Sequence, residues 1–207
     1  MRKTRAAASA IALLLTLAAA GLHAQEWDEW DFGAVPTYAR GDQTFNISLG
    51  VSLPTVFLDA DGNRMNHNFR PAVGGTGSIA YTFFLGANFF VGGELGVSFY
   101  HTLAGNTLFI VPVGITGGWQ FLLGRFEFPQ SLTIGVAPQT YLDFNYLGFF
   151  ARVRTAAFFR FNPEWSFGLN ADWSWLPQTP NEHGTRRGDM DVHGNVFGIT
   201  ISARYHF

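Results

Sequence analysis

Cysteine is absent from the 207-residue sequence. Its absence excludes disulfide bonds, and it also excludes a lipid-modified cysteine as a membrane anchor. The forces that hold this chain together are therefore non-covalent.

Long apolar runs are missing as well. The longest, residues 11–20, is too short to span a bilayer as a helix. It follows a basic start, Arg2, Lys3 and Arg5, and it leads into small residues, which is the three-part layout of a secretory signal peptide. We therefore predict a signal peptide over residues 1–24 and export from the cytoplasm. No later run of about twenty apolar residues occurs, which excludes a membrane-spanning helix.

Positive charge is scarce. Lys3 is the only lysine, and removing Arg2, Lys3 and Arg5 from the 13 basic residues leaves 10 against 15 acidic ones, a net charge of −5. Without a basic stripe to neutralise phosphates, nucleic acid is not an expected partner. Charged residues amount to only 14%, and aromatic residues to 16%. Two classes of exported protein remain, a soluble β-protein and a membrane β-barrel.

What the sequence does contain is period-two alternation. In the stretch "FNISLGVSL" large apolar residues alternate with small or polar ones, which is typical of a β-strand. Eight such segments are separated by clusters of Gly, Asn, Pro and Asp, and they cover residues 45–53, 79–85, 89–99, 109–121, 132–136, 149–161, 165–175 and 197–207. We predict an all-β domain over residues 45–207. For residues 25–44 three assignments stay open: a periplasmic tail, a segment folded into the barrel mouth, or part of a further strand.

The links between these segments alternate in length. On one side lie three fairly short links, "GAN", "LGRFEFPQ" and "NPE". On the other side lie residues 54–73, 101–107, 143–146 and 176–194, of which the first and last are long. An even number of strands with short turns on one side is typical of outer-membrane barrels, whose turns face the periplasm.

Aromatic residues are sorted by height along the predicted strands. The outer face carries, near the short links, Phe45, Phe83, Phe89, Trp119, Phe121, Phe159, Phe161, Trp165, Phe167, Tyr205 and Phe207. Near the long links it carries Phe99, Phe109, Phe149, Trp173, Trp175 and Phe197. Between them lie mostly aliphatic residues and glycine. Two aromatic girdles around an aliphatic band suit the two headgroup interfaces and the hydrocarbon, whereas a soluble core has no reason for such sorting. We therefore predict an eight-stranded antiparallel up-and-down transmembrane β-barrel in a bacterial outer membrane of the Gram-negative type, in contact with its lipids.

The chain ends in "ITISARYHF", a strand whose last residue is aromatic. Tyr205 and Phe207, with smaller apolar residues at alternate positions before them, resemble the C-terminal signature of bacterial outer-membrane proteins. This resemblance implies that the two residues act as an assembly signal read by the barrel-assembly machinery. In size, strand number and one-sided long loops the chain resembles the eight-stranded group of OmpX, OmpW and the OmpA membrane domain. The final strand is expected to pair with the first, which removes the free edge.

The inward face of the predicted strands carries few charges, and we predict that they form a lumen charge network: Glu94, Arg152, Arg154, Asp172 and Arg204. Counting from the tight "NPE" turn, Arg154 faces Asp172, and we predict that they form an ion pair. Because an unpaired charge in a narrow lumen is costly, the inferred role is a plug that stiffens the barrel.

The sequence predicts no cofactor, metal site or catalytic residue. The "DADGN" stretch resembles the start of a calcium loop, but Arg64 and Arg70 occupy the places of the required Gly and Glu. The loop histidines His67, His183 and His193 are expected to be solvated rather than metal-bound.

Three functions are consistent with this sequence. An eight-stranded barrel has an interior about filled by side chains. The leading hypothesis is therefore a structural or surface-interaction role, carried by extracellular loops that meet an unknown extracellular ligand. The alternative, implied by the resemblance to OmpW, is a passage for small hydrophobic compounds. The third is an enzyme acting on lipid A, but the closest Ser and His, Ser98 and His101, are expected on opposite faces of one strand, so no enzyme is predicted.

Overall fold

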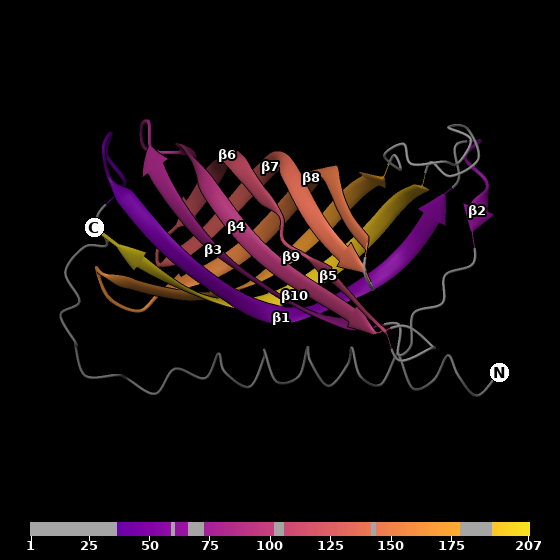
Figure 1. Ribbon diagram of the computed structural model, residues 1–207. Coiled ribbons are helices and arrows are strands. Elements are labelled where there is room, and N and C mark those ends of the chain that lie inside the picture. The colour runs from indigo at the N-terminus through magenta and orange to yellow at the C-terminus, as the bar shows by residue number, and fades with distance from the viewer. Residues whose placement is uncertain (1–36, 59–60, 66–72, 102–105, 142–143, 179–191) are drawn as a thin grey trace, which may run out of the picture. The chain divides into compact units, whose positions relative to one another are not determined.

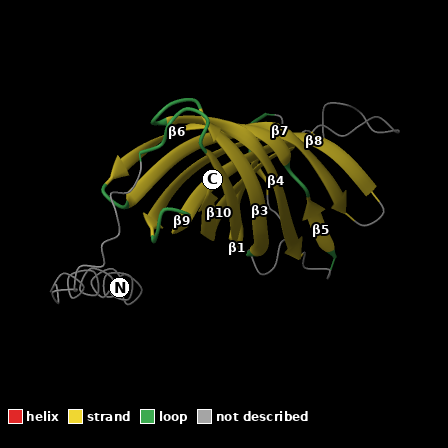
Figure 2. Ribbon diagram, turned by 90° about the vertical axis from the view of Figure 1, so that its left-hand side faces the viewer, coloured by secondary structure: helices red, strands yellow, loops and turns green. Residues whose placement is uncertain are grey.

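The computed structural model describes residues 37–58, 61–65, 73–101, 106–141, 144–178 and 192–207. The predicted signal peptide, residues 1–24, and most of the 25–44 segment lie outside these residues. Within the described ranges no helix is long and apolar enough to cross a membrane. Figure 2 shows these ranges as strands joined by loops.

The strands form one closed antiparallel sheet (Figure 1). Their bounds are β1 Gln43–Leu58, β2 Arg64–Met65, β3 Gly74–Phe84, β4 Phe89–His101, β5 Thr107–Ile110, β6 Val113–Leu123, β7 Phe126–Tyr141, β8 Phe144–Arg160, β9 Trp165–Gln178 and β10 Val192–His206. Strands β5 and β6 are two parts of one barrel strand, since both lie between β4 and β7, and β2 is a two-residue extension paired with β1. The barrel therefore has eight strands, and the predicted fold class is confirmed.

Strand β1 closes the barrel by pairing with β10. Their register runs from Thr44 opposite His206 to Leu58 opposite His193, with one shift between Pro54 and Val56. This pairing satisfies the backbone groups of the first and last strands, so neither is left as an open edge.

The outer surface is apolar and the lumen is polar, the reverse of a soluble barrel. Leu49, Ile134 and Ile201 are 63%, 58% and 65% exposed, whereas Ser48, Thr133 and Ser202 beside them are buried. The outward positions are odd-numbered in most strands and even-numbered in β7 around Ile134. The predicted facing of the strands, including the switch in β7, is confirmed.

The aromatic girdle near the short links is built from ring contacts between strands. Phe89 stacks on Trp119 with centroids 6.0 Å apart, and Phe126 contacts Phe159 at 5.4 Å. Trp165 meets Tyr205 at 5.0 Å. The girdle at the other end includes the cross-strand neighbours Phe99 and Phe109, and Trp173 and Phe197.

One predicted link was wrong. The eight residues "LGRFEFPQ" were expected to form a turn, but Leu123 pairs with Phe126 and only Gly124 and Arg125 connect the strands. Gly124 has φ 58°, a conformation that glycine adopts without strain. Strand β7 therefore begins at Phe126, six residues earlier than predicted, and this carries Glu127 into the lumen.

Ile134 tests the facing of β7. Replacing Ile134 by Arg is expected to lower the free energy of unfolding by about 2 to 4 kcal/mol, because a guanidinium would then lie at mid-height on the lipid-facing surface. Equilibrium urea unfolding in lipid vesicles measures the loss.

The matched control is Thr133→Ser on the lumen side, which keeps the hydroxyl that donates to Glu94. This control is expected to cost little. Equal stability of the two variants would contradict the assigned facing.

Candidate functional site

The described residues form two clusters of buried charge in the lumen, one at mid-height and one at the end closed by the short turns. In the mid-height cluster Glu94 of β4 is the central acceptor. Its carboxylate lies 2.6 Å from Arg152 Nη1 and 2.7 Å from Arg154 Nη2, and it accepts a hydrogen bond of 3.1 Å from Thr133. One carboxylate thus holds two guanidiniums that project from β8.

Asp172 is the second acid of this cluster. It is the cross-strand neighbour of Arg154, so the predicted register is confirmed. The predicted ion pair between them was wrong, however. The carboxylate of Asp172 lies 3.5 Å from Arg152 Nε, whereas the Nη atoms of Arg154 bond to Glu94. A guanidinium is long enough to cross a narrow lumen, and both oxygens of Glu94 are available to it.

The second cluster is centred on Glu127. Its carboxylate lies 2.9 Å from Arg160 Nε and 3.0 Å from Arg204 Nη1. Arg204 was predicted to join the Glu94 network, but it lies near the end of β10 and bonds to Glu127 instead. Each of these two arginines also covers an aromatic ring, Arg160 that of Tyr38 at 4.7 Å and Arg204 that of Phe158 at 3.9 Å.

Tyr38 joins the second cluster from outside the barrel strands. Its ring stacks on Phe84 with centroids 3.8 Å apart, and its hydroxyl donates a 2.9 Å hydrogen bond to Glu127. Burial raises the pKa of Tyr38 well above its usual range, so the hydroxyl stays protonated. Three assignments were left open for residues 25–44. The described part before β1, residues 37–42, matches one of them, a segment folded into the barrel mouth.

A serine and a histidine meet in the second cluster without forming a catalytic pair. His206 Nε2 lies 2.7 Å from the Ser166 hydroxyl, and Nδ1 lies 2.8 Å from Arg160 Nη2. Because a guanidinium only donates, Nδ1 is the acceptor and the proton of the neutral ring is on Nε2. That nitrogen donates to Ser166 and does not act as its base, so the serine is not activated for attack.

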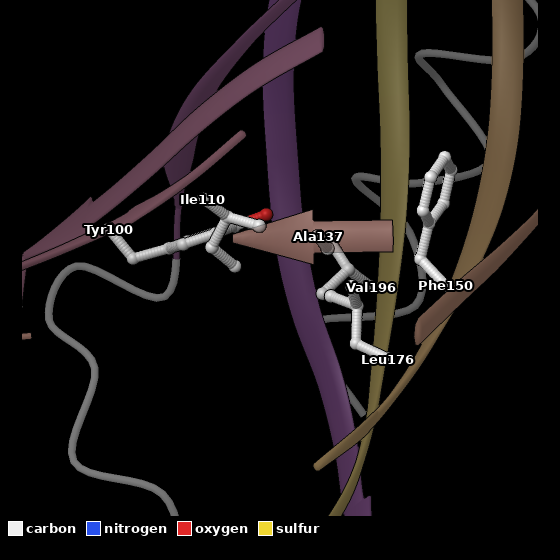
Figure 3. Close-up of a cluster of buried hydrophobic side chains, with 6 residues drawn as sticks. All are labelled: Tyr100, Ile110, Ala137, Phe150, Leu176 and Val196. Carbon is white, nitrogen blue, oxygen red and sulfur yellow. The ribbon is translucent and has the colours of Figure 1, made fainter. Parts of the chain in front are cut away.

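An apolar layer lies between the Glu94 cluster and the long links. Figure 3 shows its side chains. The layer is formed by inward side chains from six strands, Tyr100, Ile110, Ala137, Phe150, Leu176 and Val196. Between the two charge clusters lies a cavity of about 40 Å³. The described lumen is therefore filled in layers, from Tyr38 at one end to this apolar layer at the other.

The other residues considered for chemistry do not come together. Ser98 is buried and bonds to Thr76 at 2.8 Å, while His101 is exposed and bonds to Thr107 at 3.0 Å. The ring of His193 stacks on Trp175 at 5.8 Å, and His67 and His183 lie outside the described residues. In the ranges that the structure describes, no three His, Asp or Glu side chains are placed to hold a metal ion.

Sequence reasoning missed Glu127, Arg160 and His206. Arg160 and His206 could have been found from parity alone, because they alternate with outward residues of their own strands. Glu127 was missed because Pro129 and the expected long link hid the first part of β7.

The Glu94 cluster predicts strong coupling between Glu94 and Arg154. Glu94→Gln is expected to lower the free energy of unfolding by about 3 to 5 kcal/mol, because it leaves two buried guanidiniums without their carboxylate. Adding Arg154→Met should recover part of that loss, and a double-mutant cycle in urea unfolding measures the coupling. The control is Asp172→Asn, whose coupling to Arg154→Met should be smaller. If Arg154→Met coupled more strongly to Asp172→Asn than to Glu94→Gln, this would show that Arg154 bonds to Asp172.

Comparisons with known proteins agree with this architecture. A protein-family profile matches residues 24–205. A protein of Treponema pallidum (strain Nichols), described as uncharacterized, is 30% identical over 177 residues, which cover 81% of this chain and 78% of the relative.

Among solved structures, Neisserial surface protein A superposes with a TM-score of 0.53 at 8% identity, over 82% of this chain and 99% of that one. Ail, the attachment invasion locus protein of Yersinia pestis, superposes with a TM-score of 0.48 at 13% identity, over 81% of this chain and 99% of that one. The chain therefore belongs to the family whose profile matches residues 24–205, and it is a relative of the Treponema pallidum protein. Its fold is that of the small eight-stranded outer-membrane β-barrels.

Proposed function

We propose that this protein is a small barrel of the bacterial outer membrane with a structural or surface-interaction role carried by its extracellular loops. The observation that carries the proposal is the filled lumen. Two charge clusters and an apolar layer occupy it, and the cavity between the clusters has a volume of only about 40 Å³. Because the described side chains occupy most of the narrow lumen, we assign the function to the surfaces of the barrel.

The orientation follows from the links. The three short turns, residues 85–88, 124–125 and 161–164, lie at the end that also holds Phe207 and the start of β1. Short turns face the periplasm in barrels of this class. The longer links, residues 59–73 and 179–191, then lie outside the cell, where a partner or ligand is met. The apolar layer that includes Leu176 and Val196 packs the lumen near the strand ends from which the link of residues 179–191 departs.

One observation favours the second candidate, a passage for small hydrophobic compounds. The barrel strand formed by β5 and β6 is interrupted at Val111 and Pro112, and an apolar groove of about 420 Å³ lies on the outer surface next to the interruption. The wall is nevertheless bonded on both sides of it. Gly96 donates to the carbonyl of Pro112 at 2.7 Å, and Val111 donates to that of Pro138 at 2.9 Å. A passage would require these bonds to open.

Planar-bilayer recording separates the two candidates. The purified protein is expected to give no steady single-channel current, because the described side chains fill the lumen. Steady currents that an apolar compound such as an alkane blocks would overturn the structural role in favour of a passage.

Protease accessibility tests the orientation. Protease added to intact cells should cleave within residues 59–72 and 179–191, and the short turns should be cut only in permeabilised cells.

Assembly provides a separate prediction. Deleting Phe207 is expected to leave the protein unassembled in the periplasm, because the terminal aromatic is the inferred recognition point for the barrel-assembly machinery. The deletion removes one backbone hydrogen bond, from Phe207 to Gln43. Phe207→Tyr is the matched control and should assemble. Heat-modifiable migration on a gel reports assembly, and normal migration of the deletion variant would contradict the assigned signal.

A further inference from the structure

The apolar groove of about 420 Å³ on the outer surface lies over β1, β3, β4 and β5. Its lining includes Leu49, Gly77, Ile79, Val97, Phe109 and Val111. Two serines also line it, Ser48 and Ser78, but both are buried, and their hydroxyl groups form a 2.7 Å hydrogen bond with each other. The described lining therefore offers no free polar side chain, and it suits an apolar ligand.

The groove is concave because a glycine lies in its floor. Leu49 of β1, Gly77 of β3 and Val97 of β4 are cross-strand neighbours on the outer face, and the glycine is at the centre of this row. A Cβ atom at Gly77 would lie 2.8 Å from Cδ2 of Leu49, so a larger residue would fill the floor. The next outward glycine, Gly75, adds no depth, because the ring of Phe99 covers it and would clash with a Cβ atom there.

The groove lies at the height of the hydrocarbon. Its lining extends from Ile79, at the middle of β3, to Phe109, in the aromatic girdle near the long links. With the short turns in the periplasm, this half of the barrel lies in the outer leaflet. An empty groove at this height would lose dispersion contacts along its lining, so a hydrocarbon chain is the expected occupant.

We propose that this groove binds one acyl chain of an outer-leaflet lipid, an inference that rests on the membrane placement proposed above. A methylene group is about the size of a water molecule, roughly 30 Å³, so the groove has room for about fourteen of them. A concave site contacts the chain on several sides, whereas the convex wall elsewhere contacts it on one, and the additional dispersion contacts retain it. A second copy of the barrel would present a convex wall, which fits a groove poorly.

The bound chain packs against the interruption of the barrel strand between β5 and β6. Val111 lines the groove, and Pro112 follows it. Pro112 and its neighbour across the wall, Pro138, have no backbone N–H to donate to the ladder. The lipid chain thus supports the wall from outside at the place where the ladder has fewer donors.

Photolabelling in vesicles tests the site. The protein without residues 1–24 is folded into vesicles of dioleoyl phosphatidylcholine that contain a small share of a phosphatidylcholine with a diazirine in its acyl chain. After irradiation, mass spectrometry of peptides maps the labelled residues. Val97 in the groove is expected to carry several times more label than Val153, an outward valine near the middle of β8 that does not line the groove.

Two variants complete the experiment. Val97→Phe places a ring in the groove and should lower the label on Leu49 and Val111 to the level of Val153. Val153→Phe adds the same ring on another part of the wall and should leave the label on Val97 unchanged.

Each outcome decides the matter. Equal labelling of Val97 and Val153 would mean ordinary boundary lipid and would overturn the site, as would label on Leu49 and Val111 that survives in Val97→Phe. Less label on Val97 than on Val153 would show that a second copy covers the groove, which also overturns it. In these cases the barrel is still in the membrane and the proposed function stands, whereas no label on any outward residue would overturn both. If Val97→Phe does not fold, the comparison of Val97 with Val153 in the wild-type protein still decides.

Discussion

The pairing of β1 with β10 is the interaction on which the rest of the structure depends. In hydrocarbon an unpaired backbone N–H or C=O has no water to bond with, so a sheet crosses a membrane only when it closes on itself. The register that joins Thr44 to His206 and Leu58 to His193 achieves this closure. Together with the ladders between the other strands, it fixes which residues face the lumen, since side chains alternate from face to face. The apolar exterior and the polar interior are therefore consequences of one ladder of hydrogen bonds.

A closed barrel of eight strands leaves a narrow interior, and this determines how its charges are arranged. Glu94 and Glu127 each take two arginines, because a carboxylate has two oxygens and a guanidinium can reach across the lumen. Desolvation makes such pairs weak sources of net stability, although breaking one of them is costly. A slipped register would separate these buried charges from their partners, and this cost disfavours it. The barrel thereby gains a stiff interior.

The strand number, the facing of each strand and the closing pair could be predicted from the sequence, because all three depend on period two and on the positions of aromatic residues. The sequence pattern also predicted that the outward positions change from odd-numbered to even-numbered around Ile134. Side-chain partners were not predictable in the same way. Arg154 and Asp172 are neighbours in the ladder, yet Arg154 bonds to Glu94 on another strand, because its long side chain has several acceptors within reach. The odd or even position of a residue in a strand predicts only whether its side chain faces the lumen or the lipid. The ion-pair partner of that side chain depends on the shape of the lumen.

The end of the barrel near the short turns shows why local patterns miss a functional cluster. Glu127 comes from the start of β7, Arg160 from the end of β8 and Arg204 from near the end of β10, so each lies at a strand boundary where sequence patterns are weakest. Tyr38 comes from a segment without any strand pattern and reaches the same place through its stack on Phe84. Only closure of the sheet brings these residues together.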